Sequence, residues 1–311
     1  PDEVANLQIR IGNSVYRMGN GGLHSSEKSI THKATEDVRI LDRDVASYYP
    51  YIVINQRLMP QHLGENFLTV YKSIVDRRIK AKKAKQTAIA QGLKITVNGA
   101  FGKLGSPYSI LYAPDLMIQV TVSGQLCLLF LIEMMELAGI EVISANTDGV
   151  VMKVGKSQDN VYKDVIAQWE KITGFTTEET EYTSVHSRDV NAYLAIKTPD
   201  EKGKIKAKGK NVMFNPSYGG SETAIFRFHK NTMATICIKA VENLIIHNTP
   251  IEETIRACTD IRKFICVKNV RGGGHKANIY LGKVLRSYYS TGVHGTINYV
   301  IGNKKVSESE G

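Results

Sequence analysis

Hydrophobic and polar positions follow a period of two in several parts of the chain, which is the pattern of β-strands. Residues 38–45 alternate in this way and carry Asp42 and Asp44 near their end. Residues 140–154 contain two apolar runs that flank the turn sequence Asn-Thr-Asp-Gly at 146–149. Such a turn between apolar runs predicts a β-hairpin. Two further strands are expected, over 193–196 and over 205–212.

Helical periodicity is present in two other stretches. Between 66 and 105, apolar residues recur at helical spacing before a run of cations, which predicts two helices joined near Gly92. From 113 to 139, the apolar spacing predicts one long core helix that ends at Gly139. The uncharged part of this stretch, 116–132, is interrupted by polar residues and is short for a membrane span, so we expect a buried helix.

The composition is that of a globular protein with a large positive charge. Of 311 residues, 42% are apolar, and 40 Lys and Arg against 30 Asp and Glu leave a formal charge of +10. Nine of the cations and a single acid lie between 66 and 105. A charge of this size favours a polyanionic partner such as nucleic acid, the alternative being a basic protein without one.

The cysteines indicate neither a disulfide framework nor a zinc site. They form no Cys-x-x-Cys pair and have no histidine at zinc-ligand spacing, so we expect reduced core thiols in a cytosolic-type compartment. They are Cys127, Cys237, Cys258 and Cys266. The sequence begins at Pro1 without a leader peptide, and we expect a fragment or a processed product.

Asp44 and Asp148 are the candidate catalytic residues. One is predicted at the end of a strand and the other at the tip of a hairpin, where both carboxylates can reach solvent. Two carboxylates a few ångströms apart repel each other, and a divalent ion that neutralises both resolves the repulsion. A pair of such ions can activate a 3′-hydroxyl and stabilise a leaving pyrophosphate. The alternative is structural: Asp148 fills a turn position that Asp favours, and Asp44 caps the segment that follows.

Three motifs around these residues resemble those of family B DNA polymerases. The first, Asp44-Val-Ala-Ser47-Tyr48-Tyr49-Pro50, resembles D-x-x-S-L-Y-P. The second, Lys-Ile-Thr-Val-Asn-Gly-Ala-Phe-Gly at 94–102, resembles K-x-x-x-N-S-x-Y-G. The third, Ser-Ala-Asn-Thr-Asp-Gly at 144–149, resembles Y-G-D-T-D-S. The motifs stand in the order and at roughly the spacing of the family.

The resemblance implies an α+β polymerase right hand, with an antiparallel-sheet palm, short helical fingers and a C-terminal thumb. The expected boundaries are palm at 1–65 and 107–199, fingers at 66–106 and thumb at 200–311. Short fingers are most similar to those of phage-type enzymes, which would act in the host cytoplasm. The implied partners are primer–template DNA and deoxynucleoside triphosphates, without a membrane. The family's exonuclease domain would lie upstream in a longer chain or be absent from the protein.

Roles in the reaction are carried over from the family residue by residue. Asp44 and Asp148 would bind two Mg²⁺ ions, with Mn²⁺ as a substitute, and the Tyr49 ring would exclude a 2′-hydroxyl. The residues implied to hold the incoming nucleotide are Ser47, Tyr48, Tyr49, Arg78, Lys82, Lys94 and Asn98. Arg78 and Lys82 stand four apart on one helix face. Core packing is the alternative for Tyr49.

Contacts with DNA are implied for the later part of the chain. Asn191-Ala192-Tyr193 resembles K-x-Y, which contacts the primer strand, with Tyr193 kept and the Lys replaced. Residues 261–286 carry seven cations and no acid, and we assign them to a thumb that grips duplex product. The expected DNA-binding residues are Tyr193, Lys206, Lys208, Lys276, Lys283 and Arg286. For the lysines at period two from Lys204 to Lys210, a solvated strand edge is the alternative. Tyr280, Tyr288 and Tyr289 are expected in the core.

Two departures from the motifs bear on activity. Asn146 stands where the third motif has its first acid, and Phe101 replaces a Tyr whose hydroxyl could reach the template base. We expect a template-directed DNA polymerase that extends a primer 3′ end by two-metal-ion nucleotidyl transfer. The alternative, motivated by Asn146, is a non-catalytic nucleic-acid-binding module with a decayed polymerase site. An RNA-making or RNA-copying polymerase is disfavoured by Tyr49.

Overall fold

The computed structural model describes residues 7–198, 205–209, 234–288, 291–292, 296–301 and 304–309. The chain divides into two compact units, Pro1–Lys202 and Gly203–Gly311. Each unit has a sheet and a hydrophobic cluster of its own. The predictions made for Lys204, Lys210 and Tyr289 lie outside the described residues.

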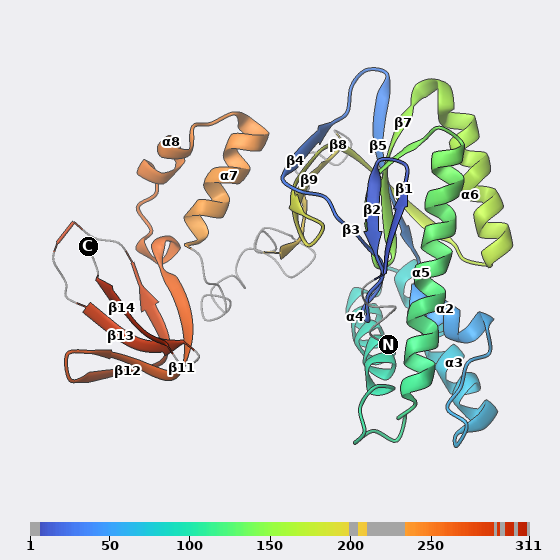
Figure 1. Ribbon diagram of the computed structural model, residues 1–311, viewed down its shortest axis with the longest axis horizontal. Helices are drawn as coiled ribbons and strands as arrows, with labels where there is room; N and C mark the ends of the chain where they lie inside the picture. The colour runs from blue at the N-terminus through green and yellow to red at the C-terminus, as the bar shows by residue number, and fades with distance from the viewer. Residues whose placement is uncertain are drawn as a thin grey trace. The chain divides into compact units, whose positions relative to one another are not determined.

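Unit 1 is built on an antiparallel sheet that contains the strands predicted over 38–45, 140–154 and 193–196 (Figure 1). The strands are β1 (Gln8–Ile11), β2 (Ser14–Arg17), β3 (His24–Ser25), β4 (Ile30–Lys33), β5 (Val38–Val45), β6 (Glu141–Asn146), β7 (Gly149–Gly155), β8 (Thr177–Asp189) and β9 (Ala192–Lys197). Their order is β1-β2-β3-β6-β7-β5-β8-β9, with β4 paired to β8. The strand predicted over 38–45 is confirmed as β5, and the hairpin over 140–154 as β6 and β7.

The helices of unit 1 supply the main hydrophobic core. They are α2 (Tyr48–Asn55), α3 (Gly64–Lys83), α4 (Thr87–Lys103), α5 (Pro114–Leu137), the short η1 (Lys156–Gln158) and α6 (Asp159–Thr173). Leu41 and Val45 of β5 belong to the core that α5 and α6 form with the sheet, whereas Ile40 belongs to a smaller cluster. Because successive strand residues point to opposite faces, Asp42 and Asp44 share the face of Ile40, turned away from that main core.

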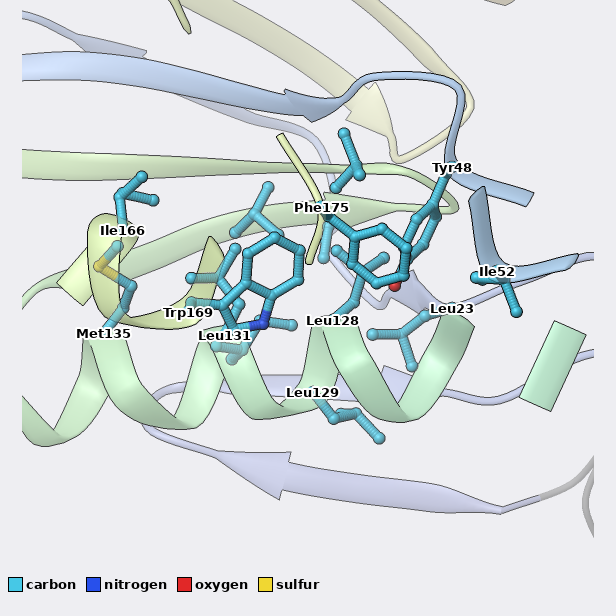
Figure 2. Packing of buried hydrophobic residues seen from close by; sticks show 14 of the residues in the cluster. Leu23, Tyr48, Ile52, Leu128, Leu129, Leu131, Met135, Ile166, Trp169 and Phe175 are labelled. Carbon is cyan, nitrogen blue, oxygen red and sulfur yellow. The ribbon is translucent and has the colours of Figure 1, made fainter. Parts of the chain in front are cut away.

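Aromatic packing ties the first turn of α2 to this core. Figure 2 shows Phe175 between Trp169 and Tyr48, above α5. The Phe175 ring centroid lies 5.1 Å from that of Tyr48 and 5.8 Å from that of Trp169. The Trp169 indole N–H donates to the Cys127 carbonyl at 2.9 Å. Burial of each such side chain contributes about 1.5–3 kcal/mol, so the turn between β5 and α2 is anchored by the core beneath it.

The long helix α5 agrees with its prediction. By length and composition it could cross a membrane, yet half of its most apolar window is buried inside the unit. Its last residue is Leu137, and Gly139 directly after the cap residue Ala138 adopts a φ of 76°. The N–H groups of Gly139 and Ile140 donate to Glu136 and Met135 carbonyls at 3.0 and 2.9 Å, which is a Schellman motif. The predicted glycine stop is therefore confirmed.

The two helices predicted between 66 and 105 are present, but they do not join near Gly92. The junction lies at Ala84–Gln86, where Lys85 takes the left-handed φ of 55° that glycine usually supplies. The Gln86 N–H donates to the Ala81 carbonyl at 2.9 Å and closes the helix end. Gly92 lies inside α4, and a single glycine weakens a helix by only about 1 kcal/mol without breaking it.

The described residues of unit 2 form a second antiparallel sheet, two α-helices and a short 3₁₀-helix. Its elements are β10 (Ile205–Ala207), α7 (Thr235–His247), α8 (Ile251–Arg256), η6 (Ile261–Phe264), β11 (Cys266–Lys276), β12 (Ile279–Ser287), β13 (Thr296–Ile301) and β14 (Lys304–Ser309). The order of the sheet is β12-β11-β13-β14. Its cluster consists of Val270, Leu285, Ile297 and Tyr299. Of the strand predicted over 205–212, residues 205–207 form β10, whereas 208 and 209 are not in a strand and 210–212 lie outside the described residues.

Two burial predictions are wrong. The four cysteines are free, as expected, but Cys237 is exposed and the other three are only half-buried. Tyr280 and Tyr288 are 55% and 52% exposed, although both were expected in the core. The reason for Tyr280 is its position on β12, an edge strand of a small sheet whose cluster is made by other side chains.

Candidate active site

Asp44 occupies a space that a glycine leaves open. It is paired in the sheet with Gly149 of β7 on one side and with Glu178 of β8 on the other. A Cβ added to Gly149 would lie 2.3 Å from Asp44 Oδ1, closer than real Cβ contacts come. The carboxylate therefore lies directly over the Gly149 backbone, and a residue with a side chain at 149 would displace it.

Asp148 is held beside Asp44 by backbone hydrogen bonds. It is exposed at the tip of the β6–β7 hairpin, directly before the residue that pairs with Asp44. Its carbonyl accepts from the Val45 N–H at 2.7 Å, and its own N–H donates to the Asn146 carbonyl at 2.7 Å. The two acids predicted from the first and third motifs thus lie side by side, one near the end of β5 and the other in the β6–β7 turn.

The first motif continues into a helix start that can face an anion. Ser47 has a left-handed φ of 52°, and α2 begins at the next residue. The N–H groups of Tyr48 and Tyr49 are in the first turn, where no preceding carbonyl of the helix can accept them. The Tyr48 side chain is buried, and its hydroxyl donates to the Gly124 carbonyl at 2.5 Å. Tyr48 can therefore serve a nucleotide only through its backbone.

Tyr49 joins the first motif to the second. Its ring centroid lies 4.7 Å from that of Phe101, and its hydroxyl donates to the Gly21 carbonyl at 2.7 Å. Burial, with a smaller effect from the Asp148 carboxylate, raises the pKa of Tyr49 to about 12. The ring is thus neutral and fixed at two ends. Tyr49 packs partly against the main core, as the alternative above predicts, and exclusion of a 2′-hydroxyl stays a prediction.

The cations predicted in the fingers are only partly brought to the site. Arg78 Nη1 donates to Ser47 Oγ at 2.6 Å, which ties α3 to the first motif. Lys82 forms an ion pair with Glu178, the sheet partner of Asp44. Lys94 and Asn98 are exposed on α4. Among the described contacts, α4 meets the first motif through Phe101 and not through these two residues.

The residues predicted to bind DNA fall in both units. Tyr193 lies on β9 and packs against the cluster that contains Ile40, so it shares the sheet face of Asp44. In unit 2, Lys206 is in β10, Lys208 follows it, Lys276 ends β11, and Lys283 and Arg286 are exposed on β12. The boundaries expected from the sequence separate the same residues, with Tyr193 in the predicted palm and the other five in the predicted thumb.

Two features of the site were missed in the sequence. Glu178 is one, because the acidic segment around it matches no motif. The other is the loop Gly19–Gly22. A Cβ on Gly22 would lie 3.0 Å from both the Tyr49 hydroxyl and Thr147 Cγ2. The glycine run Gly-Asn-Gly-Gly was an available signal for a close approach of the backbone.

The carboxylates present suit a divalent ion that is shared with a substrate. Within the described part of the chain, no three or more His, Cys, Asp or Glu side chains are grouped so as to hold a metal. Mg²⁺ is usually bound by one or two carboxylates together with water and substrate phosphates. Asp44, placed over Gly149, and exposed Asp148 fit that kind of site. They do not fit a metal held by protein ligands alone.

Comparison with known proteins gives one line of support. No protein-family model matches the sequence, and neither does any curated protein. Among solved structures, the chain is similar to the family B DNA polymerase from the hyperthermophilic archaeon Pyrobaculum calidifontis, with a TM-score of 0.54 and 15% identity. The match covers 97% of this chain and 44% of that chain. The protein therefore has a mixed fold of helices and antiparallel sheet that resembles part of a family B polymerase. The similarity supports the family B fold and not the phage type.

Proposed function

We propose that this chain is the polymerase part of a family B enzyme, which adds deoxynucleotides to the 3′ end of a primer as a template directs. The observation that carries the proposal is the placement of the Asp44 carboxylate over Gly149, directly beside Asp148. Two neighbouring acids, one near the end of β5 and one in the β6–β7 turn, with a helix that begins four residues after Asp44, form a site that takes divalent ions and phosphates together. The fold supports the family but not the catalytic step.

The chain's own residues would bind and orient the substrates. The N–H groups at the start of α2, with Arg78 and Lys82, would hold the triphosphate. Lys82 would exchange its Glu178 partner for a phosphate, which carries more negative charge. The Tyr49 ring, fixed by Gly21 and Phe101, would meet the sugar and leave no room for a 2′-hydroxyl. The chemistry supplied by bound Mg²⁺ or Mn²⁺ is activation of the primer 3′-hydroxyl and stabilisation of the leaving pyrophosphate.

The finer assignments are part of the same proposal. The sheet of unit 1 would be the palm, and α3 and α4 would be the fingers, short as in phage-type enzymes. Unit 2 would be the thumb, with Lys276, Lys283 and Arg286 on the duplex. A phage enzyme of this kind would act in the host cytoplasm, with any exonuclease domain in the remainder of a longer chain.

Primer extension with the variant Asp148→Asn tests the proposal. Loss of a carboxylate from a two-acid site is expected to lower the rate by about 10²-fold or more, because a charge-stabilising group of the transition state is removed. Asp164→Asn, at an exposed acid of α6, is the matched control for the change of charge. Undiminished extension by Asp148→Asn, with the control unchanged, would remove the proposed site.

The second candidate function is a nucleic-acid-binding module without catalysis, which Asn146 motivates. It predicts tight binding of DNA whose affinity falls steeply with salt. It also predicts no release of pyrophosphate with Mg²⁺ or Mn²⁺ on any primer–template. A steady-state assay of pyrophosphate release therefore separates the two functions.

A further inference from the structure

Two positions at which this chain departs from the family motifs are in contact with each other. Asn146 stands in place of an acid in the third motif, and Asn191 stands in place of the Lys of K-x-Y. Asn146 Nδ2 donates to the Val190 carbonyl at 2.7 Å and to Asn191 Oδ1 at 3.3 Å. Its Oδ1 accepts from Thr147 Oγ1 at 3.1 Å. Both ends of the amide are therefore used, and its orientation is fixed by its partners.

An acid would fit poorly at position 146. A carboxylate there would turn an acceptor oxygen towards the Val190 carbonyl, which is also an acceptor. It would lose the donor for that carbonyl and add a negative charge two residues from Asp148. The amide supplies the donor and adds no charge. Asparagine at position 146 thus fits the hydrogen-bonding groups around it. A site that had lost its function would not need such a fit.

The contact links the hairpin tip to the turn before Tyr193. Val190 and Asn191 form the turn between β8 and β9, and Tyr193 follows on β9. The same turn is held from its other side, since Asp189 Oδ1 accepts from the Asn191 N–H at 2.9 Å. A shift of this turn would move Tyr193 relative to Asp148.

We propose that Asn146 and Asn191 form a neutral amide pair, at positions where the motifs have an acid and a Lys, and that this pair positions the Tyr193 segment against the hairpin tip. An acid and a Lys together carry no net charge, and neither do two amides, so the exchange of both partners leaves the charge around Asp148 unchanged. Exchange of one partner alone would change that charge by one. Asn146 is a positioning residue on this account, and the proposal rests on the function proposed above.

The test is a double-mutant cycle with Asn146→Asp and Asn191→Lys. Each single variant is expected to raise the KM for primer–template roughly tenfold, since hydrogen bonds are lost and one charge is left unbalanced. The effect on kcat should be smaller, because Asp44 and Asp148 are untouched. The double variant gains an ion pair, although the Val190 carbonyl still lacks the Asn146 donor, and its KM should be several-fold lower than the two single effects together predict. Asn160→Asp, at an exposed asparagine of α6, is the control for an added negative charge.

Two outcomes of the cycle would overturn the proposal. If Asn146 marks decay of the site, Asn146→Asp alone restores the family's acid and raises activity, and that outcome would overturn the proposal. Additive effects of the two substitutions would overturn it as well. The same double-mutant cycle is also measured with the melting temperatures of the four proteins, which do not depend on catalysis. If no variant extends a primer, the proposed function fails, while non-additive melting temperatures still support the amide pair.

Discussion

Gly149→Ala is the most direct perturbation of the site, because a single methyl group enters the space of the Asp44 carboxylate. The added Cβ would lie 2.3 Å from Asp44 Oδ1, and Cβ atoms essentially never come closer than 3.0 Å to another atom. The carboxylate or β5 must therefore move by at least 0.7 Å, the difference between these two distances. A displacement of about 1 Å at a reacting centre costs on the order of 10² in rate.

The substitution should leave the fold intact. Gly149 is not among the residues with positive φ, so its backbone conformation is open to alanine. Replacement of glycine by alanine at a compatible position stabilises a protein by about 0.4–1 kcal/mol through the unfolded state, which offsets part of the local crowding. We expect a change of less than about 1 kcal/mol in the free energy of unfolding, if the carboxylate swings aside.

Single-turnover primer extension over a range of Mg²⁺ concentrations measures the effect. Gly149→Ala is expected to slow the step about 10²-fold and to raise the Mg²⁺ concentration needed for half of the maximal rate. Gly92→Ala in α4 is the control, since its Cβ would meet nothing within 4 Å. A Gly149→Ala enzyme with the wild-type rate and Mg²⁺ dependence would show that the position of Asp44 is unimportant.

Two further predictions concern Tyr49 and unit 2. The pKa of Tyr49 is raised to about 12 in the folded state, above the ordinary value of 10, so its contribution to stability is complete below pH 10 and is lost as the pH rises towards 12. Urea unfolding between pH 9 and 12 should therefore show a smaller loss of stability in Tyr49→Phe than in the wild type, and equal losses would contradict the assigned environment. In unit 2, Lys276→Ala, Lys283→Ala and Arg286→Ala should each reduce the slope of log K against log salt by about 0.9 if that side chain contacts a phosphate of duplex DNA. An unchanged slope, equal to that of Lys171→Ala in α6, would remove the residue from the DNA surface.

The parts of the fold that the sequence predicted are those set by neighbouring residues. The strand β5 and the hairpin β6–β7 were found at their predicted positions, since alternation and turn chemistry act within a few residues. The end of α5 at Gly139 is of the same kind. The junction of α3 and α4 was misplaced because Lys85 takes a glycine-like conformation, while Gly92 is only a tolerated helix residue.

The parts that could not be predicted depend on contacts between distant residues. Motif spacing indicated Asp44 and Asp148, and the structure brings β5 together with the hairpin that carries Asp148. Glu178 reaches the site only because β8 pairs with β5, and nothing in its local sequence records that pairing. The exposure of Tyr280 follows from its edge strand, which periodicity within a segment does not reveal.

The link between the glycine loop and α5 has a consequence for recognition. Gln125, almost fully buried in α5, accepts from the Gly19 N–H at 2.8 Å and donates to the Gly19 carbonyl at 3.0 Å. A single side chain thus acts as a neighbouring strand would, satisfying both backbone groups of one residue. The conformational entropy of Gly19 is therefore lost when the protein folds, and no further loss is needed when a ligand binds. A nucleic acid that meets this loop would find a surface already in shape, and its affinity would not be reduced by the need to arrange that segment.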